Sequence, residues 1–441
     1  MVFLPVLFGI LFVLSAVNIH ASPTEQLTLK NGMHVVVRRD TRSPVALVSM
    51  WYHVGSTNEH NGITGISHLL EHMMFRGTHN VPDGDFSKQI IVHGERVNAF
   101  TSRDNTAYVD EVAVSQIPLV LKLEADRMQH LVLDPQVFLT EQKVVLEERH
   151  ARVTDQPLAL LAERYQAAAQ TANPYQHPIV GWLADIQQLT TNDLYTWYYR
   201  WYQASYATLV VVGDVKPSLV FKQAQDIFGG IVSHGQQSER KQFPLLPALG
   251  EKTVLVHCVS RVSAVLVGFN VPTVVSAKHA WQPYALEMLA YLAAGNHYGW
   301  LYQDLVYHQK LAAGVRVHYT PFAHYNTLWS VEAVPMHSVP LAKRKKGLLA
   351  DLQLLAGPVS DPLRLQIAYT DIRAEHIYAQ DTLSGQENWL GILHANNVQM
   401  TLQSYFQQLH KVIPAQFQQV SDVYLQTKNM TVAELMGEDK A

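Results

Sequence analysis

The stretch His68-Leu69-Leu70-Glu71-His72 constrains this chain more than any other feature of its sequence. Residues four apart on an α-helix lie on the same face, so His68 and His72 on a helix would point toward one ion. Glu71 borders that face without having to be a ligand. A zinc site built for catalysis keeps one position open for water, and a nearby carboxylate can take that water's proton. The stretch therefore predicts a helix that binds zinc and carries its own base.

A second helix, predicted at residues 135–155, offers the missing third ligand. Glu141 and Glu148 are seven residues apart, which is two helical turns, so they share a face, whereas Glu147 is rotated away from it. Taken alone, a glutamate on a helix is usually a solvated surface residue. Together with two upstream histidines, the pair favours a zinc site of two imidazoles and one carboxylate.

These motifs resemble the pitrilysin/insulinase family of zinc metallopeptidases, in the branch similar to mitochondrial processing peptidase and its bacterial relatives. That family carries His-x-x-Glu-His and a downstream glutamate, and here 75 residues separate His72 from Glu148. The likeness continues in residues 71–78, 97–108, 177–181 and 206–214. The resemblance implies that one zinc ion per chain is held by His68, His72 and Glu148. It further implies Glu71 as the general base and Glu141 as an acid that supports the ligands.

A short strand near residues 96–100 is the expected substrate site. In the resembled family such a strand borders the zinc and offers its edge to an extended peptide, which implies substrate contacts from Asn98, Ala99 and Phe100. Main-chain hydrogen bonds along a strand edge are indifferent to side chains, which suits a peptidase acting on unfolded segments. The alternative is that Asn98 merely ends a turn after Gly94.

The order of predicted elements indicates an α+β fold with two similar α/β-sandwich domains in tandem. Strands interrupted by long helices, with hairpin-connected neighbours, disfavour a doubly wound sheet. A polar, glycine- and proline-containing stretch at residues 233–250 predicts a linker. It separates a zinc-binding domain at residues 22–232 from a domain at residues 251–441. The second domain repeats the order of strands and helices without a His-x-x-Glu-His of its own, which indicates an internal duplication.

The N-terminus predicts export. Residues 2–19 contain no charged side chain, and we expect a signal peptide at residues 1–21 and a periplasmic protein. The alternative is an uncleaved N-terminal membrane anchor, which would be the chain's only membrane contact. With 33 basic and 37 acidic residues the net charge is −4, so there is no electrostatic basis for nucleic-acid binding.

Trp300 raises the question of a partner subunit. Active members of the resembled architecture commonly use an Arg and a Tyr after a glycine-rich turn to hold the substrate, and Trp300 stands where that Arg is often found. A homologous partner chain without zinc, or a second copy of this chain, would supply the missing group. Arg316 is the alternative within the chain.

Two functions follow. The first is a zinc endopeptidase that hydrolyses peptides or unfolded protein segments, and the second is a non-catalytic zinc-binding assembly subunit of the same fold. The intact set of ligands and base favours the enzyme.

Overall fold

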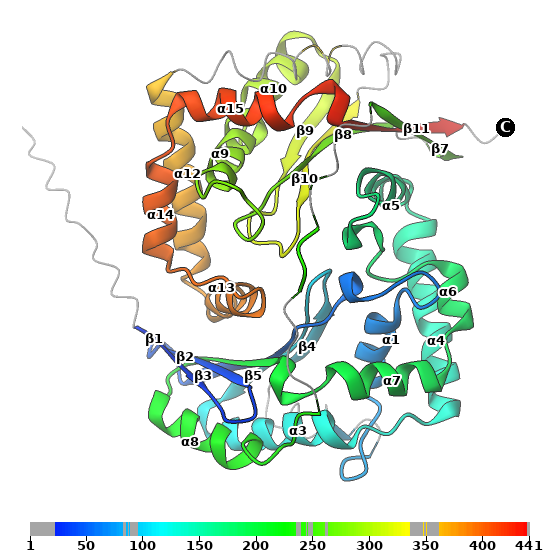
Figure 1. The fold of residues 1–441 in the computed structure, drawn as a ribbon, viewed down its shortest axis with the longest axis vertical. Coiled ribbons are helices and arrows are strands. Elements are labelled where there is room, and N and C mark those ends of the chain that lie inside the picture. The colour runs from blue at the N-terminus through cyan, green and yellow to red at the C-terminus, as the bar shows by residue number, and fades with distance from the viewer. Residues whose placement is uncertain are drawn as a thin grey trace, which may run out of the picture.

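The computed structural model contains two layered halves, each built on its own β-sheet (Figure 1). It describes residues 23–82, 85–86, 88, 96–234, 240–243, 245, 250–260, 263–335, 347, 350 and 361–438. The predicted signal peptide lies outside these residues. Within them, no helix is both long and apolar enough to cross a bilayer.

The first half is built on a six-stranded mixed sheet with the spatial order β1-β2-β6-β3-β5-β4. β2 and β6 are parallel, and every other neighbouring pair is antiparallel. β6 is buried along its whole length, as its run of valines predicts for a strand covered on both faces. The strands are β1 (Thr24–Thr28), β2 (His34–Arg39), β3 (Val45–Tyr52), β4 (Arg96–Thr101), β5 (Thr106–Ala113) and β6 (Ala207–Gly213).

Helices of the same half cover one face of this sheet. Val35, Val37 and Val48 point to that face and pack with apolar side chains of the covering helices. The helices are α1 (Ile66–Met73), α3 (Ile117–His130), α4 (Pro135–Arg149), α6 (Leu183–Gln188), α7 (Thr191–Trp201) and α8 (Pro217–Phe228). The helix predicted through residue 155 is α-helical only to Arg149 and continues as a π-helical turn, His150–Thr154.

The second half repeats this plan around a five-stranded sheet with the order β7-β11-β8-β10-β9. The strands are β7 (Lys252–Val259), β8 (Ala264–Val271), β9 (Ala312–His318), β10 (Thr327–Pro335) and β11 (Met430–Glu438). Its own helices are α9 (Gln282–Ala294), α10 (Trp300–Tyr302), α12 (Pro362–Ala379), α14 (Leu402–His410) and α15 (Pro414–Tyr424).

The two sheets confirm the predicted duplication. Without β1, the first order reads β2-β6-β3-β5-β4, and each strand has a counterpart at the same place in the second order. The parallel pair recurs as well, because β11 runs parallel to β7 as β6 does to β2. The fold is therefore α+β with two similar domains in tandem, as expected from the sequence. The boundaries at residues 232 and 251 stay a prediction.

One helix of each half packs on the sheet of the other half. α5 (Pro157–Ala169), from the first half, packs on β11, β7 and β8 of the second sheet. α13 (Leu383–Ala395), from the second half, packs on β6 and β3 of the first sheet, opposite to α1 (Figure 1). Polar contacts accompany both: Trp51 Nε1 donates to Glu387 Oε1 at 2.7 Å, and the hydroxyls of Tyr165 and Ser330 lie 2.7 Å apart.

Candidate metal centre

A buried carboxylate holds the beginning of α1. Glu59 accepts hydrogen bonds from the backbone N–H of Gly65 at 2.8 Å and of Ser67 at 2.9 Å. Gly65 has φ +86°, and a Cβ at this position would lie 2.4 Å from the carbonyl oxygen of Val180, so the turn into the helix requires glycine. Together these contacts fix which side chains of α1 face α4.

The three predicted zinc ligands meet between α1 and α4. The rings of His68 and His72 lie on successive turns with their centroids 4.9 Å apart. Glu148 Oε2 lies 3.8 Å from His68 Nε2 and 3.3 Å from His72 Nε2. One ligand atom from each residue lies within 4.8 Å of the other two, and no other group of His, Cys, Asp or Glu in the described residues does so. Glu147, by contrast, is exposed, as its place on the helix predicts.

Three further contacts orient the side chains of this cluster. Glu141 is 2% exposed, and its Oε2 lies 3.2 Å from His72 Nδ1. A proton on Nδ1 that is donated to Glu141 leaves the lone pair of His72 on Nε2, the atom that faces Glu148. Arg76 Nη2 pairs with the other oxygen of Glu141 at 2.7 Å, and Arg152 pairs with Glu148 Oε1 at 2.8 Å, which leaves Oε2 toward the histidines.

The donor set fits zinc. Two imidazoles and one carboxylate are the ligands of many catalytic zinc sites, which keep a further position for water or substrate. Burial lowers the pKa of His68 to about 4, so its ring is neutral near pH 7, which is the form that binds metal. The second half has no counterpart of this group among its described residues.

Glu71, on α1, lies beside this cluster and contacts the last residue of β4. The hydroxyl of Thr101, the last residue of β4, donates a hydrogen bond of 2.6 Å to Glu71 Oε2. Burial raises the pKa of Glu71, although the bond from Thr101 acts in the opposite direction. A raised pKa suits a carboxylate that takes up a proton and releases it again near neutral pH.

β4 is the outermost strand of the first sheet, and within the described chain it pairs only with β5. Asn98 lies in the middle of this strand, so it does not end a turn. The strand's side chains alternate: Ala99 packs toward the face of α1, and Phe100 packs edge to face on Trp51, with ring centroids 5.4 Å apart. The strand predicted to receive substrate is therefore an edge strand whose last residue contacts Glu71.

Sequence reasoning missed four residues that support the site: Glu59, Arg76, Thr101 and Arg152. Arg152 lies four residues after Glu148, so helical spacing could have indicated their ion pair. Arg76 lies beyond the end of α1 and pairs with Glu141 of α4, a contact that the local sequence does not mark. Nothing in the local sequence marks Thr101, because its contact with Glu71 depends on how α1 packs on the sheet.

Trp300 and Arg316 lie in the second half. Trp300 begins α10 and packs against that half's core, whereas Arg316 is exposed on β9, opposite Glu332 of β10. The predicted need for a partner stays a prediction.

The fold and the cluster can be compared with those of known proteins. The tandem fold, with a His-His-Glu cluster that the described residues place in the first half only, is typical of two-domain zinc metallopeptidases. The sequence pattern described as Insulinase (Peptidase family M16) matches residues 34–181, and that of the Peptidase M16 inactive domain matches residues 188–356. The chain belongs to peptidase family M16.

Individual relatives agree with this assignment. The chain is 33% identical over 314 residues to a protein named zinc protease PqqE from Helicobacter pylori, a match that covers 70% of each. It is 29% identical over 208 residues to a probable mitochondrial-processing peptidase subunit beta of Arabidopsis thaliana, which covers 47% of this chain and 39% of that protein. The crystal structure of a protease from Helicobacter pylori superimposes with a TM-score of 0.88 at 27% identity, covering 94% of this chain and all of that one.

Proposed function

We propose that this chain is a zinc-dependent endopeptidase that hydrolyses peptides or unfolded protein segments. The observation that carries the proposal is the meeting of His68, His72 and Glu148 beside a half-buried carboxylate, Glu71, that is not part of the ligand cluster. An edge strand ends at the same point, so an extended peptide added to β4 would pass close to the base.

The chain's own groups account for the proton transfers. When bound by His68, His72 and Glu148, zinc would act as a Lewis acid toward water and the scissile carbonyl. Glu71 would accept a proton from the attacking water and pass it to the departing amine. Thr101 orients Glu71 by its hydrogen bond, and Glu141 orients His72.

Substrate choice would follow from backbone shape. Hydrogen bonds along the outer edge of β4 need an extended chain and do not depend on side chains. Folded proteins offer few such segments, so flexible peptides are the expected substrates. The uncharged N-terminal run supports a periplasmic location.

A non-catalytic assembly subunit of the same fold is the alternative. Such a subunit has no need of a base beside two metal ligands. The presence of Glu71 with its supporting Thr101 therefore favours the enzyme.

The test is Glu71→Gln, which keeps the side chain's shape and removes the base. We expect the variant to retain zinc while hydrolysis of a fluorogenic peptide slows by about 10²–10⁴-fold. Zinc content and peptidase rate are measured on the same preparation, with wild type as the reference. Wild-type protein that holds zinc but cleaves no peptide would favour the assembly subunit, and near-normal activity of the variant would exclude Glu71 as the base.

A further inference from the structure

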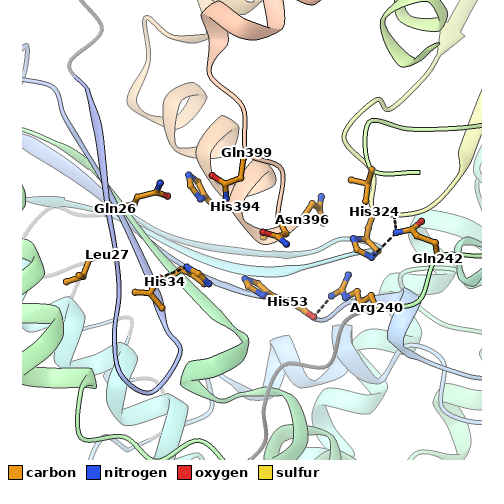
Figure 2. Close-up of a pocket in the computed structure, with 14 residues that line it drawn as sticks. Gln26, Leu27, His34, His53, Arg240, Gln242, His324, His394, Asn396 and Gln399 are labelled. Atoms are coloured by element: carbon orange, nitrogen blue, oxygen red, sulfur yellow. Dashed lines mark hydrogen bonds between the residues drawn. The ribbon is translucent and has the colours of Figure 1, made fainter. Parts of the chain in front are cut away.

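A cavity of about 790 Å³ lies between the two halves, on the sheet face that α13 covers and thus opposite to α1 (Figure 2). Its walls come from the β1–β2 hairpin, the end of β3, residues 240–242, and the loop that follows α13. The volume is in the range of small-molecule sites.

The lining has an unusual charge pattern. None of its 14 residues is Asp or Glu, although the chain has more acidic than basic residues. Four imidazoles and one guanidinium face the cavity instead, together with side-chain amides (Figure 2). These cationic or potentially cationic residues are His34, His53, His324, His394 and Arg240.

Arg240 is held in place by the backbone around it. Its Nη2 donates to the carbonyl oxygens of His53 and Asp104. Its Nη1 lies 3.8 Å from Asp104 Oδ1, and that nitrogen is buried without a hydrogen-bond partner in the described structure. The guanidinium is therefore a fixed charge beside the cavity, partly balanced by the Asp104 carboxylate.

Burial favours the neutral form of all four imidazoles. Burial lowers the pKa of His53 to about 3 and that of His394 to about 4, and it also lowers the pKa values of His34 and His324. The charged groups that act on them are Arg38 near His394, Arg240 near His53, and both Arg240 and Asp104 near His324. An added negative charge would favour their protonated, donating forms.

These imidazoles do not form a second metal site. Their nitrogens do not gather as a ligand group among the described residues, where only the cluster at His68 does so. The donors are instead spread around the walls. Asn397 and Gln399 extend them from the loop after α13, and both are exposed.

We infer that this cavity binds an organic anion, carrying carboxylate or phosphate groups, that bridges the two halves. Arg240 supplies the fixed positive charge, the imidazoles gain protons as the anion enters, and the amides of Asn397 and Gln399 donate at the rim. Binding is therefore linked to proton uptake, and the affinity rises as the pH falls. The inference does not depend on peptidase activity, because the metal centre lies on the opposite face of the sheet.

The test uses the full chain with zinc bound and titrates it calorimetrically with succinate and, separately, with inorganic phosphate. We expect one anion per chain, with an affinity that increases from about pH 8 to about pH 6 and a heat that depends on the buffer, as proton uptake requires. The tighter of the two probes identifies the carboxylate or the phosphate as the preferred group.

Gln399→Glu places a carboxylate at the rim with almost no change of shape, and Asn397→Asp does the same at a second exposed position. Each should weaken binding at least about tenfold. The matched control is Gln403→Glu, an exposed position on α14 outside the lining, which should leave the affinity unchanged. Binding that is indifferent to both rim substitutions, or absence of binding by either probe, overturns the inference.

Discussion

At the scale of single residues, His72 has contacts on both ring nitrogens. Nε2 faces Glu148, and Nδ1 faces Glu141, whose second oxygen is paired with Arg76. A metal-binding histidine commonly donates its other N–H to a carboxylate, which fixes both the tautomer and the ring orientation. Glu141 is thus placed to act on zinc through His72.

Glu141→Gln tests this role. The amide keeps the shape of the side chain, but it is a weaker hydrogen-bond acceptor for His72 and leaves Arg76 without its charged partner. We therefore expect zinc affinity or activity to fall by about 10–100-fold. Zinc dissociation constants from competition with a chelator provide the measurement. Glu147→Gln, an exposed position on the same helix, should match wild type. Complete loss of zinc in Glu141→Gln would make Glu141 a ligand and exclude the supporting role.

The shared faces of the metal-site residues could be predicted because helical periodicity is a local property, whereas the family resemblance implies Glu148 rather than Glu141 as the third ligand. The spacing within 68–72 and between Glu141 and Glu148 determines which side chains share a face, and the structure brings these faces together. Thr101 could not be predicted in this way. Its contact with Glu71 joins a helix to a strand 30 residues away, and only the packed fold sets that distance.

At the scale of secondary structure, the position of α1 depends on Glu59. This carboxylate is 5% exposed and bonds two backbone N–H groups at the start of the helix. Burial raises its pKa from 4.5 to about 7. In the window between these values the folded protein holds a proton on Glu59 that the unfolded chain has lost, so the free energy of unfolding falls as the pH rises.

Replacing Glu59 by Gln removes this titration. The unfolding free energy of wild type, measured relative to that of Glu59→Gln, should therefore fall between about pH 5 and about pH 7, by up to about 1.4 kcal/mol per pH unit. Urea unfolding at several pH values measures it. Glu25→Gln, at an exposed site, controls for the loss of one charge. A difference that stays constant across the window would contradict a raised pKa.

β-branched runs predict most of the strands, but they do not predict β11. It lies between β7 and β8 and is a central strand of the second sheet. Its sequence, Met430–Glu438, contains Glu434, Gly437 and Glu438, which are not typical of a buried strand. Its pairing joins residues far apart in the chain, and the repeat of the first half's topology is the one signal that could have indicated it.

At the scale of the whole molecule, α5 and α13 hold the two halves together, because each packs on the sheet of the other half. Gly391 of α13 lies against the indole of Trp51, and a Cβ at Gly391 would come within 2.1 Å of that ring. Trp51 is 1% exposed, so its ring has little room to move. Gly391→Ala should therefore destabilise the protein by about 1–3 kcal/mol, measured by thermal or urea unfolding. Gly230→Ala, where the added Cβ meets open space, is the matched control. Equal stability of the two variants would mean that α13 does not pack tightly on the first sheet.

We propose that the active form is a dimer with a homologous chain that lacks the zinc motif and helps to hold the substrate. Trp300 stands where the resembled enzymes often carry a substrate-binding Arg, and its ring is partly buried against the core of the second half. Arg316 is the alternative within the chain, but it is exposed on β9, opposite Glu332. Two facing chains would enclose the metal centre in a chamber that admits extended peptides and excludes folded proteins.

The chain expressed alone should therefore show weak peptidase activity that rises when the partner is added, with a matching increase in mass measured by light scattering. A self-associated dimer with full activity would identify a second copy as the partner, and a monomer with full activity on short peptides would exclude any partner.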